Sequence, residues 1–86
     1  MANVDHVVEA LQVLKAAQAD VPAAEERARQ VVADARHRID VARDKLAKTI
    51  AAEYQRGARV GDLARRSEYS RETIRRILRA AGIEAD

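Results

Sequence analysis

Arginine side chains gather near the carboxyl end of the chain, at a spacing typical of one helix. Arg71, Arg75, Arg76 and Arg79 fall within nine residues, together with one acid, Glu72. A guanidinium group donates paired hydrogen bonds to phosphate oxygens or to a guanine edge, and a carboxylate accepts one from a cytosine amine. These residue types therefore indicate a surface for nucleic acid. The alternative is a solvated helix face on which Glu72 and Arg76 form an i,i+4 ion pair.

Two short helices joined by a tight turn are predicted to carry these arginines. The first extends from about Val60 to Ser67 and the second from Arg71 to Ala81. Ser70 suits the N-cap of the second helix, and Gly82 suits its end, where a left-handed residue is common. The residues expected to face the core are Leu63, Ala64, Ile74, Ile77 and Leu78, with Leu46, Ile50 and Tyr54 from the helix before them.

The sequence of this unit resembles a known DNA-binding motif. Leu63-Ala64, followed by Tyr69-Ser70-Arg71-x-Thr73-Ile74-x-x-Ile77-Leu78, is similar to the helix-turn-helix of resolvase/Hin-type recombinase DNA-binding domains and of short bacterial regulators. The resemblance covers residues 46–83. Three positions depart from it: Glu68 stands where such motifs usually have glycine, Ser67 where they have an apolar residue, and Arg59 where a Ser or Thr cap is common.

The resemblance implies that the second helix enters the major groove of double-stranded DNA with its amino-terminal part. Base contacts are then expected from Arg71, Glu72 and Arg75. Glu72 equally suits the start of a helix, so both of its roles stay open. Phosphate contacts are expected from the backbone at the start of the first helix and from the side chains of Arg66, Tyr69, Ser70, Arg76 and Arg79.

Charge is distributed unevenly along the chain, whose formal net charge is +2. Residues 1–55 contain eight Lys or Arg against nine Asp or Glu, whereas residues 56–86 contain eight Arg against five acids. A basic segment beside a nearly neutral one is expected of a nucleic-acid binder with a separate interaction region.

The residues before the basic unit are predicted to form a helical hairpin, so the whole chain is expected to be all-α. The first helix extends from about Asn3 or Val4 to Ala19 with Asn3 as its cap, and Asp20-Val21-Pro22 interrupts it. A long second helix from about Pro22 to Arg56 ends at Gly57 and continues into the basic unit. Residues 1–45 are thus expected to mediate dimerisation and residues 46–86 to bind DNA.

A fold-back register supports the hairpin, because apolar residues of the two helices then face each other. The second helix carries a coiled-coil-like stripe of Ala28, Val32, Ala35, Ile39, Ala42 and Leu46. With the turn near residues 21–22, the facing pairs are Leu14 with Ala28, Leu11 with Val32, Val7 with Ala35, and Val4 with Ile39.

A homodimer is expected because one hairpin encloses little core. Apolar residues make up 48% of the chain, but 19 of them are alanines, and Phe and Trp are absent. Two hairpins would form a four-helix bundle. The alternative is that the valines off the facing stripes, Val8, Val13, Val31 and Val41, are scattered surface side chains. The predicted interface residues are Val4, Val7, Val8, Leu11, Leu14, Val31, Val32 and Ile39.

Several classes of protein are not supported by the sequence. Without cysteine there is no disulfide or thiolate site, and His6 and His37 lack an evident third metal ligand. Neither a phosphate loop nor a Ser–His–Asp spacing occurs, so we expect no enzyme, cofactor, metal or small-molecule substrate. A basic stretch followed by an apolar one is also missing at the start, so we expect a cytoplasmic, nucleoid-associated protein.

The favoured hypothesis is a homodimeric, sequence-specific DNA-binding transcriptional regulator, for instance a repressor. Two alternatives stay open. One is a nucleoid-type architectural protein that binds DNA with little sequence preference, and the other is a helical module that binds another protein.

Overall fold

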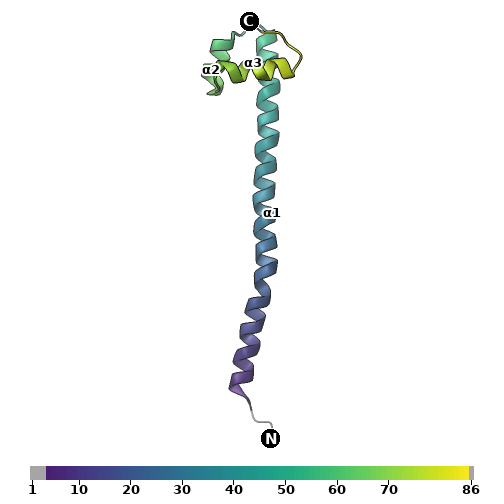
Figure 1. The fold of residues 1–86 in the computed structure, drawn as a ribbon, viewed down its shortest axis with the longest axis vertical. Helices are drawn as coiled ribbons and strands as arrows, with labels where there is room; N and C mark the ends of the chain where they lie inside the picture. Colours follow the sequence, from purple (N-terminus) through teal and green to yellow (C-terminus); the bar gives the residue numbers. More distant parts are fainter. Residues whose placement is uncertain (1–3, 86) are drawn as a thin grey trace. The chain divides into compact units, whose positions relative to one another are not determined.

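The computed structural model of the chain describes residues 4–85. Three helices make up this part of the chain (Figure 1): α1 is His6–Gln55, α2 is Val60–Ser67 and α3 is Arg71–Ala80. No strand occurs between residues 4 and 85, which confirms the all-α prediction. The predicted bounds of the two short helices are confirmed to within one residue.

The chain divides into two units, Met1–His37 and Arg38–Asp86, and α1 contributes to both. In the first unit the described residues form one helix and its amino-terminal cap. In the second unit the last part of α1 packs with α2 and α3 around a small core. The functional division that the sequence analysis set at residues 45/46 stays a prediction.

The predicted hairpin is wrong. Asp20, Val21 and Pro22 all lie inside α1, so the chain does not reverse there. A reversal between helices usually uses a residue that tolerates positive φ, and no glycine occurs before Gly57. Proline costs one backbone hydrogen bond, but Ala23 and Ala24 directly after Pro22, and Ala16, Ala17 and Ala19 in the turns before it, are the strongest helix formers. The helix therefore continues, and the four facing pairs of the hairpin register do not form.

The residues predicted to form the dimer interface are consequently exposed. Their exposed fractions range from 44% for Leu11 to 77% for Val7. The two stripes that were expected to cover each other in one chain are not covered by each other, and only Leu46 at the end of the second stripe packs on the core. Without hairpins, the expected bundle of hairpins is excluded as well. The exposed set is Val4, Val7, Val8, Leu11, Leu14, Val31, Val32 and Ile39.

Asp5 caps the amino-terminal end of α1. Its carboxylate oxygen Oδ1 accepts hydrogen bonds from the backbone N–H groups of Val7, at 3.0 Å, and Val8, at 3.1 Å. An aspartate cap satisfies N–H groups that have no partner within the helix and complements the helix dipole. The predicted cap, Asn3, lies outside the described residues.

Glycines end α1 and α3 as predicted. Gly57 has φ of 110° and follows α1, with Ala58 N–H donating to the Glu53 carbonyl at 3.0 Å. Gly82 has φ of 79° and follows α3, with Ile83 N–H donating to the Leu78 carbonyl at 2.8 Å. Both are Schellman arrangements, in which a left-handed residue lets the chain satisfy the last carbonyls of the helix.

Candidate nucleic-acid interface

The core of the second unit fixes the orientation of α3. Ile74 and Leu78, one turn apart on α3, are fully buried. Ile50 of α1 and Leu63 of α2 are each 3% exposed and belong to the same cluster. Side chains at i and i+4 lie on one face of a helix, so burial of Ile74 and Leu78 turns the opposite face of α3 to solvent. The predicted core residues are confirmed, although Ala64, Ile77, Leu46 and Tyr54 are only partly buried.

A short turn joins α2 to α3 and holds the start of α3 in place. Glu68 takes the left-handed conformation, with φ of 65° and ψ of 12°. The Tyr69 N–H donates to Ser67 Oγ at 3.1 Å, and Ser70 Oγ accepts from the Thr73 N–H at 3.1 Å. The Ser70 hydroxyl also donates to Thr73 Oγ1 at 2.9 Å. Ser70 is therefore the predicted N-cap of α3, and Ser67 supplies a hydrogen bond that an apolar residue could not.

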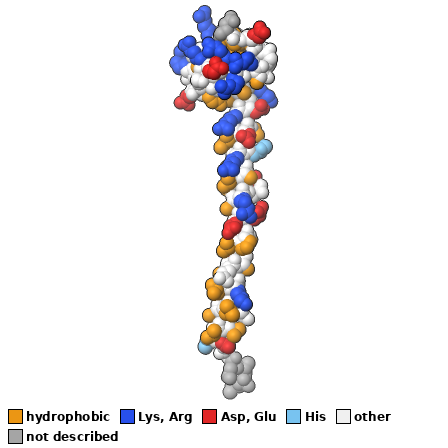
Figure 2. All heavy atoms as spheres, in the orientation of Figure 1, with side chains coloured by type: hydrophobic (Ala, Val, Ile, Leu, Met, Phe, Trp, Pro, Cys, Tyr) orange, Lys and Arg blue, Asp and Glu red, His pale blue; other side chains and the backbone are white. Residues whose placement is uncertain are grey.

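The outward face of α3 carries the charged residues that the sequence singled out. Glu72, Arg75, Arg76 and Arg79 are spaced i, i+3, i+4 and i+7, which places them together and away from the buried face. Glu72, Arg76 and Arg79 are exposed, and Arg75 is partly buried. In Figure 2, Lys and Arg side chains gather on the surface of this second unit.

Three ion pairs hold charged side chains of α2 and α3 in place. Glu72 Oε1 lies 3.2 Å from Arg79 Nη2, two turns along α3, so the i,i+4 pair with Arg76 considered above does not form. On α2, Arg66 Nε lies 3.1 Å from Asp62 Oδ2, and Arg65 pairs with the same carboxylate. Within residues 4–85, neither Arg75 nor Arg76 forms an ion pair, which leaves both guanidinium groups available to an anionic ligand.

Gly61 is a residue that the sequence analysis missed. A Cβ atom added to Gly61 would lie 3.0 Å from Arg71 Nη2 and 3.3 Å from Arg71 Cζ. The guanidinium group of Arg71 therefore rests against the first turn of α2, where any larger side chain would displace it. Arg75 follows Arg71 by one turn and shares this edge of α3. The available signal was a glycine within a short predicted helix. Glycine lowers the stability of a helix, but it lets another group approach the backbone closely.

Other polar side chains of the second unit occupy different environments. Tyr69 is partly buried and packs against the core cluster, so only part of its side chain is available to a ligand. Arg59 is the N-cap of α2 but makes no side-chain capping hydrogen bond. On α1, the Asp44 carboxylate lies 2.9 Å from Lys48 Nζ and raises the pKa of Lys48 above its ordinary value by hydrogen bonding and charge attraction.

Neither a metal-binding group nor a membrane-spanning helix is found among the described residues. Between residues 4 and 85, no group of three or more His, Cys, Asp or Glu side chains is arranged to hold a metal ion. In the same range, no helix is long and apolar enough to cross a membrane. Comparison of the chain with family models, curated proteins and solved structures gives no match.

Proposed function

We propose that the chain is a sequence-specific double-stranded DNA-binding regulator that acts as a homodimer, with α2 and α3 as a helix-turn-helix. The observation that carries this proposal is that α3 is amphipathic, with one apolar face and one basic face. Ile74 and Leu78 are fully buried on one face, and Arg75, Arg76 and Arg79 lie on the other. A short helix that is anchored by its apolar face and presents arginines outward is suited to the major groove.

The available contacts suggest how the roles divide. Arg71 lies against the first turn of α2, Arg75 follows it by one helical turn, and we assign both to base edges. Arg76 has no ion-pair partner among the described residues and is assigned to a phosphate, together with Ser70, Arg66, Arg79 and Tyr69.

Glu72 is the ambiguous member of this face. Its ion pair with Arg79 would have to open before Glu72 could accept a hydrogen bond from a cytosine. The pair supports the helix-stabilising role, and it also neutralises a carboxylate that would otherwise repel phosphates. Glu72→Gln separates these roles, since a base reader loses preference at one position and a stabiliser does not.

Replacement of Arg75 by alanine tests the proposal. We expect Arg75→Ala to weaken binding to a DNA site selected from random sequences by about 1–3 kcal/mol and to relax preference at one base pair. Arg43→Ala is the matched control, because it removes the same charge from α1 rather than from α3. Equal loss on all DNA sequences would make Arg75 a phosphate contact. Absence of DNA binding by the unaltered chain at low salt would contradict the proposed function and favour a protein-interaction module.

A further inference from the structure

Continuity of α1 joins its two apolar stripes into one. Steps of three and four residues alternate from Val4, just before α1, to Leu46, and the first ten positions, as far as Ala35, lie in the first unit. This is a heptad repeat, whose period of 3.5 residues is shorter than that of a straight α-helix and favours left-handed supercoiling around another helix. We name these ten positions the seam: Val4, Val7, Leu11, Leu14, Gln18, Val21, Glu25, Ala28, Val32 and Ala35.

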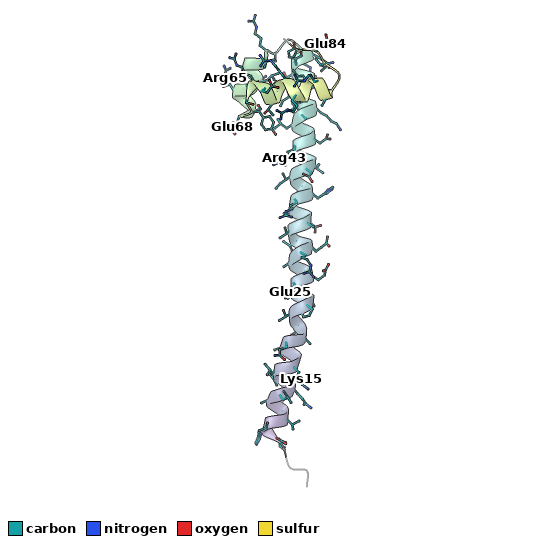
Figure 3. All side chains as sticks on the ribbon, viewed as in Figure 1. Lys15, Glu25, Arg43, Arg65, Glu68 and Glu84 are labelled. Carbon is teal, nitrogen blue, oxygen red and sulfur yellow. The ribbon has the colours of Figure 1, made fainter. Side chains whose placement is uncertain are left out.

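The seam is not covered by any described part of its own unit. Leu11 is 44% exposed and Leu14 is 53% exposed, and Figure 2 shows hydrophobic side chains along α1. In Figure 3, Lys15 and Glu25 project from α1 with no other element of the first unit beside them. A largely apolar, solvent-exposed stripe of this length marks an interaction surface, because isolated helices in water gain little stability without packing.

We propose that the seam binds the seam of a second copy of the chain, in parallel and in register, as a two-stranded coiled coil. This inference rests on the proposed homodimer and specifies how it forms. Both DNA-binding units then follow the same end of the paired helices, as recognition of two adjacent half-sites requires.

The charges beside the seam favour a second copy in the parallel orientation. One flank carries Val8, Lys15, Pro22, Arg29 and Arg36, and the other carries the small or apolar residues Ala10, Ala17, Ala24 and Val31 before it reaches Arg38. In a parallel pair the basic flank of one helix meets the neutral flank of the other, so that the basic side chains lie over alanine and valine. In an antiparallel pair the basic flanks would meet each other, with repulsion between like charges.

Two polar residues inside the seam would set the register of the two helices and limit the stability of the dimer. In register, Gln18 meets Gln18 of the second copy, and two amides can hydrogen-bond to each other. Glu25 meets Glu25, and these like charges oppose association. Arg29 Nη1 lies 4.0 Å from Glu25 Oε2 and offsets part of this charge. The seam is therefore expected to form a reversible dimer rather than a permanent one.

Single cysteines test the orientation cleanly, because the chain has no cysteine of its own. A parallel, in-register pair brings residue 7 of both copies within disulfide range, so mild oxidation of Val7→Cys should give covalent dimers. Ala16→Cys, on the outer face of the same helix, is the control and should not cross-link. Cross-linking only when Val7→Cys is mixed with Val32→Cys, the residue that Val7 faces when the seam pairs antiparallel, would overturn the proposal.

Two neighbouring glutamates supply an independent test. Glu25→Gln removes like charges from the seam and should lower the dimer dissociation constant by about fivefold or more. Glu26 also contacts Arg29, at 2.8 Å, but lies outside the seam, so Glu26→Gln should leave the constant nearly unchanged. Equal effects of the two substitutions, or a monomer by light scattering at high concentration, would overturn the inference. A monomer that still binds a single DNA half-site would leave the proposed function standing.

Discussion

Glu68 holds a backbone conformation that few non-glycine residues adopt. Its φ of 65° places the left-handed turn between α2 and α3 at a residue with a Cβ atom. The turn keeps this geometry because Ser67 and Ser70 satisfy the N–H groups beside it, at Tyr69 and Thr73. The strain at Glu68 is thus balanced by local hydrogen bonds and by the core that α2 and α3 share.

Replacement of Glu68 by glycine should stabilise the fold. Glycine adopts positive φ without steric cost, so Glu68→Gly should raise the free energy of unfolding by about 0.5–1 kcal/mol, measured by urea denaturation. Glu68→Ala removes the same side-chain charge but keeps the Cβ atom, and should give no such gain. If both variants gain equally, the charge of Glu68 and not its φ is responsible.

Gly61 is expected to position Arg71 for DNA. Gly61→Ala introduces a Cβ atom against the Arg71 guanidinium group, which must then move. Because alanine favours helix over glycine, the variant should be as stable as the natural chain or more stable by up to about 1 kcal/mol. Its preference at the base pair assigned to Arg71 should nevertheless change, as read by selection from random DNA. In an Arg71→Ala background the substitution should have no further effect on preference, and an added effect there would show that Gly61 acts through another group.

At the scale of elements, the short helices were predictable and the long one was not. Ser70, Gly57 and Gly82 mark helix ends because each meets a specific backbone requirement, and all three do so in the structure. The hairpin prediction failed because it treated Pro22 as a stop, although Ala23 and Ala24 follow it and no glycine is available nearby for a reversal. The apolar spacing did not discriminate between pairing within one chain and pairing between two.

The N-cap of α3 offers a way to separate stability from DNA binding. Ser70→Ala removes the hydrogen bond to the Thr73 N–H and should cost about 1 kcal/mol of unfolding free energy. Ser70→Asp keeps an acceptor at the cap, so stability should be retained, but its negative charge faces the proposed phosphate and should abolish tight DNA binding. Wild-type affinity in Ser70→Asp would place this cap away from DNA.

At the scale of the whole molecule, we propose that α1 couples two DNA-binding units. Leu11→Asp places a charge in the seam and should give a monomer by light scattering. Affinity for a two-half-site DNA should then fall by about 10²-fold or more, because the two units no longer bind as one ligand. Val13→Asp is the matched control, since Val13 is 71% exposed and lies outside the seam. A Leu11→Asp chain that remains dimeric would contradict the assigned interface.

The charge distribution along the chain fits this arrangement. The arginine surplus lies in residues 56–86, and the nearly neutral residues 1–55 include the whole seam. Sequence alone predicted the basic unit and its core, because buried positions and caps obey local rules. It did not predict the contact between Gly61 and Arg71, which depends on how α2 and α3 pack together. Nor did it predict the ion pair between Glu72 and Arg79, which depends on how two long side chains extend along two turns of α3.

The most direct measurement is the affinity of the chain for two kinds of DNA at one fixed salt concentration. One is duplex DNA selected from a random pool, and the other is random duplex DNA of equal length. We expect the selected sequences to form an inverted repeat and to bind about 10³-fold tighter or more than random DNA. Equal affinities for selected and random DNA would contradict sequence-specific recognition by α3 and would instead indicate a DNA-coating protein with little sequence preference.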